Sequence, residues 1–218
     1  MALPLICLGS NEQGNPNKKC LASRYNYDTM PDISYDLNYV AVSLGELKTY
    51  LLSKELFWPL RLKPAPGKPS VAKLTPGNLL FSFACLDATR QAKTLAPRRE
   101  SELQKLEGEF NTLRKKWAVA WEKKATSEFT SRLRQWRLYL NEVERDTKTH
   151  APYYPTEVRL RVLLELLQDN LIDTPETDLT ALDDDLRSHF TPGDFIWDAD
   201  LSGGFSQEKY WFLRGDIE

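Results

Sequence analysis

The sequence has few of the residues, and none of the short motifs, on which many enzymes depend. Its 218 residues include only two histidines and three cysteines. It contains no phosphate-binding P-loop, no dinucleotide fingerprint, no G-x-S-x-G nucleophile turn and no H-E-x-x-H zinc motif. Catalytic sites also form from residues scattered along a chain. The missing motifs therefore favour a non-enzymatic protein but do not exclude an enzyme.

Cysteine and long apolar runs are also scarce. Cys7, Cys20 and Cys85 are odd in number and lack metal-like spacing, which indicates a reducing compartment. Cys85 lies in an apolar run with no histidine nearby in sequence, so we interpret it as a core thiol. The apolar opening residues 2–8 are too short and lack the positive leader of a signal peptide. No other run approaches the ~20 residues needed to span a bilayer. We expect a cytoplasmic protein without a membrane partner.

The charges that are present are unevenly distributed. The composition, 41% hydrophobic and 28% charged, is that of a globular protein, and the formal net charge is −2. Residues 165–218 carry fourteen acidic and three basic side chains, a balance of −11, so the rest of the chain carries +9. This asymmetry predicts either that the acidic third packs near the basic part or that each attracts a different partner. Neutralisation within the chain is the simpler hypothesis.

No proline interrupts residues 98–151, and the stretch 97–148 has the pattern of a long helix. Its apolar residues recur in steps of three and four, which keeps them on one stripe. Between the halves, Trp117, Trp121, Ala125 and Phe129 step by four each time, as in a coiled-coil stutter. One long helix is the favoured interpretation. The alternative is a break near residues 124–127 that folds the stretch into a helical hairpin.

The polar face of this stretch is basic. Eight positive residues lie between positions 114 and 137: Arg114, Lys115, Lys116, Lys123, Lys124, Arg132, Arg134 and Arg137. With the interspersed tryptophans they could form a nucleic-acid groove of cationic and stacking side chains. The favoured alternative is a solvated helix face whose tryptophans lie in the core and whose Arg and Lys stems cover its edge.

The remaining segments complete a mainly α-helical single domain, a bundle around one long helix that is either continuous or broken once. Residues 1–40 are expected to be an irregular wrap, Ser43 to cap a helix, and residues 58–75 to be a proline-rich connector. Thr75 and Pro76 predict the start of a buried helix. Further helices are predicted over residues 158–171, with Arg159 and Arg161 paired with acids, and over 176–190. The aromatic, acidic tail 191–218 should pack on the helices, with a short strand at most.

One short motif resembles the start of a calcium loop. Asp198, Asp200 and Ser202 place oxygen ligands at positions one, three and five, and Gly203 follows at position six. Position twelve, however, is Lys209 instead of the required glutamate. An Asp-rich turn explains the same residues. We therefore expect no cofactor, with calcium as the alternative.

Together these patterns lead to three hypotheses about function. The first is a non-enzymatic interaction or adaptor protein that binds another protein or itself, with a homodimer through the long helix as one form. The second is nucleic-acid binding through the basic face of residues 114–137. The third is a metal-dependent enzyme that uses the acidic C-terminal third.

Overall fold

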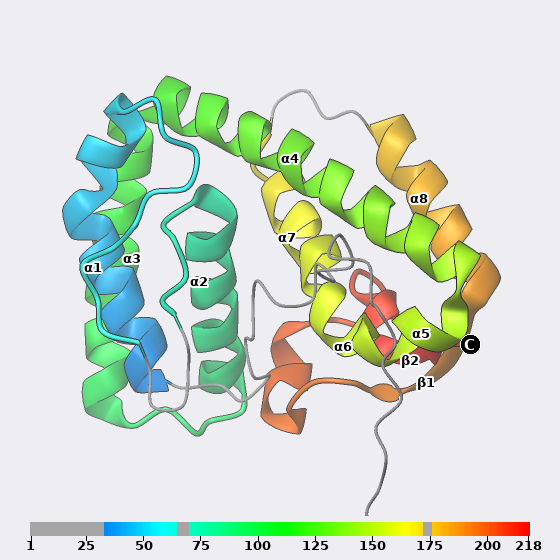
Figure 1. Cartoon of the computed structure of the whole chain (residues 1–218). Coiled ribbons are helices and arrows are strands. Elements are labelled where there is room, and N and C mark those ends of the chain that lie inside the picture. Colours follow the sequence, from blue (N-terminus) through cyan, green and yellow to red (C-terminus); the bar gives the residue numbers. More distant parts are fainter. Residues whose placement is uncertain (1–32, 65–69, 172–175) are drawn as a thin grey trace, which may run out of the picture.

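The protein is mainly helical, as the sequence predicts. The computed structural model describes residues 33–64, 70–171 and 176–218. Helices α1 (Ile33–Leu52), α2 (Pro76–Gln91) and α3 (Pro97–Lys116) stand side by side at one end, and α4 (Ala118–Arg145) crosses to the other end (Figure 1). There it meets α5 (Thr147–His150), the 3₁₀ turn η2 (Ala151–Tyr153), α6 (Tyr154–Glu157), α7 (Arg159–Gln168) and α8 (Glu176–His189). The tail adds strands β1 (Phe190–Phe195) and β2 (Arg214–Ile217), with the 3₁₀ turns η3 (Ala199–Gly204) and η4 (Trp211–Leu213) between them.

The long stretch is two helices with a bend at Trp117, so it is the broken form of the expected long helix and not the continuous form that was favoured. Trp117 has φ −115° and ψ 30°, outside the helical region. Its N–H still donates to the Leu113 carbonyl, and its carbonyl accepts from the Trp121 N–H, both at 2.9 Å. The bend falls where the stutter begins, and α4 continues unbroken through residues 124–127, so no hairpin forms there.

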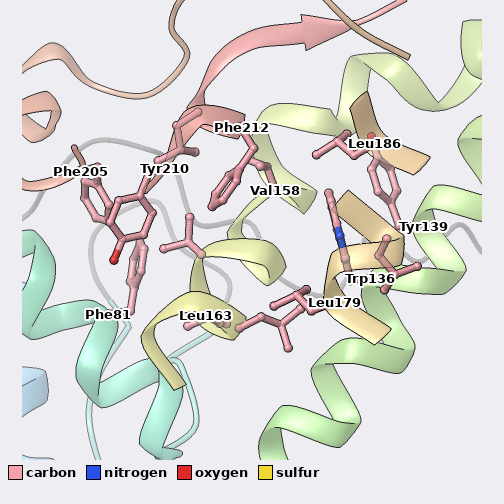
Figure 2. Close-up of a cluster of buried hydrophobic side chains, with 14 of the residues drawn as sticks. Phe81, Trp136, Tyr139, Val158, Leu163, Leu179, Leu186, Phe205, Tyr210 and Phe212 are labelled. Carbon is pink, nitrogen blue, oxygen red and sulfur yellow. The ribbon is translucent and has the colours of Figure 1, made fainter. Parts of the chain in front are cut away.

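The apolar stripe of α3 and α4 is buried inside the chain, in two hydrophobic cores. The N-terminal core joins α1 and α3 to the first turn of α4, with Leu47, Leu103, Phe110 and Trp121 in its centre. The C-terminal core joins the rest of α4 to α7, α8 and the tail, and Figure 2 shows Trp136, Leu163 and Phe212 within it. Because the chain bends at Trp117, the apolar stripe of α3 packs in the N-terminal core and that of most of α4 packs in the C-terminal core. The predicted burial of the tryptophans among basic residues is confirmed for Trp121 and Trp136.

Helix α2 lies between the two cores and is shared by them. Phe81 and Cys85 belong to the C-terminal core, Leu79 and Leu86 to the N-terminal core, and Leu80 packs against both. A helix that is apolar nearly all round is expected in such a central position. Its start is the predicted one, since the Thr75 hydroxyl accepts from the Asn78 N–H at 3.1 Å and Pro76 follows.

The tail packs on the helices as predicted, but the expectation of one short strand at most is wrong, because the tail contains a short antiparallel pair of strands. Phe190 pairs with Ile217 and Pro192 with Gly215, and the register is irregular between Pro192 and Phe195. Gly215 has φ +146°, and a Cβ there would lie 2.2 Å from the Thr191 carbonyl oxygen. Glycine therefore permits the closest approach of the two strands.

The N-terminal part differs from the expectation. Helix α1 begins at Ile33, so residues 33–40 are helical and not irregular, while residues 1–32 lie outside the described part. Ser43 is buried in mid-helix and caps nothing, and the Glu46 carboxylate instead accepts from the Trp58 indole N–H at 2.6 Å. The local capping pattern was outweighed by apolar residues on both sides of it, such as Leu37 and Leu44, which pack in the N-terminal core. In the connector, residues 65–69 are not described, and Trp58 forms a single bridge with Leu74.

The contact between η3 and α2 leads to a testable expectation. A Cβ on Gly204 would lie 2.4 Å from the Ala88 Cβ and 2.8 Å from its Cα, and Ala88 is fully buried on α2. Gly204→Ala should therefore push η3 away from α2 and destabilise the protein by about 1–3 kcal/mol in urea unfolding. Gly203→Ala is the matched control, because its nearest neighbour would be the Gln91 Oε1 at 3.8 Å. Equal stability of the two variants would contradict the close approach.

Candidate functional site: a buried polar cluster and an exposed basic corner

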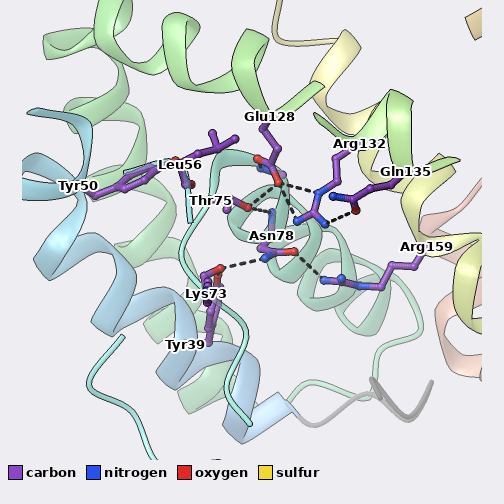
Figure 3. A network of polar contacts seen from close by, with 11 residues as sticks. Tyr39, Tyr50, Leu56, Lys73, Thr75, Asn78, Glu128, Arg132, Gln135 and Arg159 are labelled. Atoms are coloured by element: carbon purple, nitrogen blue, oxygen red, sulfur yellow. Dashed lines mark hydrogen bonds and ion pairs between the residues drawn. The ribbon is translucent and has the colours of Figure 1, made fainter. Parts of the chain in front are cut away.

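A cluster of polar side chains lies buried where the two cores meet, and Glu128 is its centre (Figure 3). The Glu128 side chain of α4 reaches the first turn of α2. Its Oε1 accepts from the Thr75 hydroxyl and its Oε2 from the Gly77 N–H, each at 2.7 Å. A carboxylate is stabilised at this position because the first N–H groups of a helix lack internal partners and carry the positive end of its dipole.

Arg132, one turn further along α4, neutralises Glu128. Its Nε and Nη2 both donate to the Glu128 Oε1 at 3.2 Å, and its Nη1 donates to the Gln135 side chain at 3.3 Å. The guanidinium also lies over the Phe57 ring, 5.3 Å from its centroid. Glu128 is 0% and Arg132 is 1% exposed. A charge this deeply buried needs an opposite charge and hydrogen bonds to offset its desolvation.

Asn78 extends the cluster to α7 and α1. Its Oδ1 accepts from the Arg159 Nη2 at 3.0 Å, and its Nδ2 donates to the Lys73 carbonyl at 2.9 Å. The Tyr39 hydroxyl of α1 donates to the same carbonyl at 3.1 Å. Burial of the Tyr39 ring raises the pKa of its hydroxyl far above the ordinary value. The cluster thus ties α1, α2, α4 and α7 together at the boundary of the two cores.

The geometry of the cluster suits a structural link better than proton transfer. Both oxygens of Glu128 already accept hydrogen bonds from Thr75, Gly77 and Arg132. The sequence does not predict Glu128 and Arg132 as a buried pair, because charged residues on a long helix resemble a solvated face. The available signal was their spacing of four together with the flanking core residues Phe129 and Leu133.

The structure separates the eight basic residues predicted for nucleic-acid binding. Lys124 and Arg132 are buried, and Arg114 is half-buried with its guanidinium over the Trp121 ring. The Lys124 ammonium donates to the Glu55 carbonyl and lies 4.6 Å from the Tyr50 ring centroid, and burial lowers its pKa. Exposed residues from the same set are Lys115, Lys116, Lys123, Arg134 and Arg137. The set therefore does not form one continuous groove.

Part of the set gathers with the end of α1 at one corner of the molecule. We call residues 48–55 and 114–123 the basic corner. The two segments are joined by the Lys124 bond to the Glu55 carbonyl and by the Lys48 ammonium, which lies 5.9 Å from the Trp117 ring centroid. In Figure 1 the corner lies at the outer edge, where α1 ends and α4 begins.

The residues of the predicted calcium loop have other contacts in the structure. The Asp198 carboxylate accepts from the Asp200 N–H at 2.9 Å and so starts η3, while the Ser202 hydroxyl donates to the Ala199 carbonyl at 2.7 Å. Within residues 33–64, 70–171 and 176–218, no three His, Cys, Asp or Glu side chains converge as metal ligands. Calcium binding at Asp198, Asp200 and Ser202 stays a prediction.

Cys85 is a buried core thiol, as predicted, and burial raises its pKa well above the ordinary value of 9.0. In a variant with Cys7 and Cys20 replaced by serine, we expect Cys85 to react with a thiol reagent roughly a hundredfold more slowly in the folded than in the urea-unfolded protein. Because the unfolded thiol ionises before the buried one, the stability that the neutral thiol retains below pH 9.0 should fall as the pH rises from 9.0 toward the folded pKa. Equal reaction rates in the two states would refute the burial.

Comparison with protein-family models, with curated proteins and with solved structures found no match for this chain. Among the described helices, none has both the length and the apolar character required to cross a bilayer. Inference about function therefore rests on the buried polar cluster and the basic corner.

Proposed function

We propose that the protein is a cytoplasmic, non-enzymatic interaction protein that docks on its partner through the basic corner. The observation that carries this proposal is the exposure of large apolar side chains there. Val119 is 83% and Leu52 60% exposed, more than any other large hydrophobic residue in the described part of the chain. Each lies in a segment of the corner that also carries exposed lysines, and exposed apolar side chains rimmed by polar residues are typical of interaction sites.

The burial of the long apolar stripe supports this location. Leu103, Phe110, Phe129, Leu133 and Trp136 are all buried against other parts of the same chain. A coiled-coil homodimer through that stripe would have to displace them. An interaction through the basic corner requires no such rearrangement. The buried polar cluster supports the non-enzymatic part of the proposal, because the Glu128 carboxylate is already bonded on both oxygens.

The proposal is tested by affinity capture from the native host with the wild-type protein and a corner variant, Leu52→Gln with Val119→Gln. Leu138→Gln is the matched control, since Leu138 is 47% exposed on α4, fifteen positions beyond the end of the corner. A partner that the wild type and the control retain and the corner variant loses supports the proposal. Equal recovery by all three proteins would refute docking of a captured partner on the corner.

Nucleic-acid binding is the second candidate, because Lys115, Lys116 and Lys123 remain exposed at the corner. Replacing these three lysines should then abolish a salt-dependent gel shift and reduce the salt slope by about one for each lost phosphate contact. Capture from nuclease-treated and untreated lysate separates the candidates, because a nucleic-acid partner is lost on treatment.

A further inference from the structure

The basic corner combines positive charge with exposed aliphatic side chains. Residues 48–55 and 114–123 contain six basic side chains (Lys48, Lys54, Arg114, Lys115, Lys116 and Lys123) and two acidic ones (Glu55 and Glu122), a balance of +4. All five lysines are exposed, and none forms an ion pair with another part of the described chain. Ala118 and Val119 follow the bend directly and are also exposed.

The described residues of the acidic third do not neutralise this corner. Helix α8 packs along the C-terminal half of α4, where Arg137 pairs with Asp178 at 3.3 Å. The corner lies at the opposite end of α4, as Figure 1 shows. The predicted neutralisation of basic residues by the acidic third is therefore seen, within the described residues, in the C-terminal half of α4. The corner keeps its positive field although the net charge of the chain is −2.

We propose that the basic corner binds the surface of an anionic lipid bilayer. This inference rests on the proposed docking function of the corner and names its partner. Five of its six cations are lysines, whose compact charges on flexible stems suit a diffuse layer of phosphates. Lysine is depleted in protein–protein interfaces, whose cores favour aromatic residues and arginine. The proposal departs from the sequence-based expectation of no membrane partner. That expectation came from the scarcity of long apolar runs, and a peripheral contact with a bilayer surface requires no spanning helix.

The corner has aliphatic, aromatic and basic side chains, which match the acyl-chain boundary, the interface and the phosphate layer of a bilayer surface. Val119 and Leu52 are aliphatic and the most exposed, so they enter the boundary between headgroups and acyl chains. Trp117 of the same corner is half-buried, with the Lys48 ammonium 5.9 Å from its ring centroid, and it has the amphipathic ring found at such interfaces. Lys115 and Lys116 precede it and reach the phosphates. Nucleic acid offers no apolar layer for Val119 and Leu52, which favours the bilayer over the second candidate.

The test is co-sedimentation of the full chain with vesicles of phosphatidylcholine alone and of phosphatidylcholine mixed with phosphatidylserine. We expect binding to the mixed vesicles only, weakening as the salt concentration rises. Each lysine near an anionic surface contributes about fivefold in affinity, so Lys115→Ala, Lys116→Ala and Lys123→Ala together should weaken binding about a hundredfold. Leu52→Gln with Val119→Gln should weaken it about tenfold.

Two controls keep the test specific. Lys105→Ala, Arg145→Ala and Lys148→Ala remove the same charge from exposed positions outside the corner, and Leu138→Gln removes an exposed aliphatic side chain from another part of α4. Both should bind the mixed vesicles within about twofold of the wild type, since charges beyond a Debye length of about 8 Å are screened. Equal losses in the corner and control variants would overturn the inference.

The outcomes also separate this inference from the proposed function. If the wild type fails to bind mixed vesicles at low salt, but corner-dependent capture of a protein or a corner-dependent gel shift persists, the lipid inference is wrong and a docking role for the corner stands. If neither vesicles nor any captured partner depends on the corner residues, both proposals are wrong. Binding to phosphatidylcholine alone with no effect of the lysine substitutions would also overturn the inference.

Discussion

Glu128→Ala should lower the free energy of unfolding by about 3–5 kcal/mol, because Arg132 then stays charged and buried without the carboxylate that it contacts. Arg132 would lose the acceptor of two hydrogen bonds, and the Thr75 hydroxyl and the Gly77 N–H would lose theirs. Urea unfolding followed by circular dichroism measures the change. Glu144→Ala, an exposed glutamate on the same helix, should change stability by less than about 0.5 kcal/mol.

A double-mutant cycle separates the ion pair from the rest of the cluster. Arg132→Met alone leaves Glu128 buried and without its cation, so it should also be strongly destabilising. Combining it with Glu128→Ala removes both charges, and we expect the double variant to lose less than the sum of the two single changes, by about 1–3 kcal/mol. Additive losses would show that Glu128 acts through Thr75 and Gly77 alone.

The second large effect is expected at Arg161, which joins α7 to α8. Its Nε and Nη2 donate to the two oxygens of Asp183 at 2.7 and 2.8 Å, and its Nη1 donates to Glu165 at 2.7 Å. Arg161→Leu should cost about 2–4 kcal/mol, because two carboxylates that are mostly buried then lose their shared cation. Arg161→Lys should cost about 1–2 kcal/mol, since one ammonium cannot reproduce the planar two-point contact.

Arg137 provides the matched control for this prediction. It also links α4 to α8, through Asp178, but both side chains are about half exposed. Exposed ion pairs contribute between 0 and about 1 kcal/mol, so Arg137→Leu should have a small effect. Similar losses for Arg137→Leu and Arg161→Leu, measured in the same unfolding assay, would contradict the importance of burial.

The sequence predicts the helices well where apolar periodicity is strong and less well where local and distant signals compete. Thr75 and Pro76 mark the start of α2 because an N-cap followed by proline is decided within four residues. The capping pattern of Ser43 and Glu46 is equally local. Helix α1 nevertheless continues through it, because the apolar residues on both sides of the pattern pack in the N-terminal core. The acidic partners predicted for Arg161 are confirmed, since the sequence surrounds α7 with carboxylates.

The candidate site was less accessible to sequence reasoning. Glu128 contacts Thr75 across 53 positions, and Arg159 contacts Asn78 across 81. The spacing of apolar residues along a helix does not show which of its charged residues is buried against a partner so distant in sequence. The bend at Trp117 also depends on distant contacts. The chain changes direction there because the two halves of the apolar stripe pack in different cores. No proline or glycine marks the position in the sequence.

The sharing of α2 by both cores has a consequence for synthesis on the ribosome. The first turn of α2 leaves the exit tunnel long before Glu128, and Asn78 long before Arg159. The N-terminal helices therefore emerge with one side of α2 uncovered and its polar start unpaired. We expect the nascent chain to acquire stable structure only after α7 has emerged, so that neither end of the protein can be expressed alone as a folded fragment.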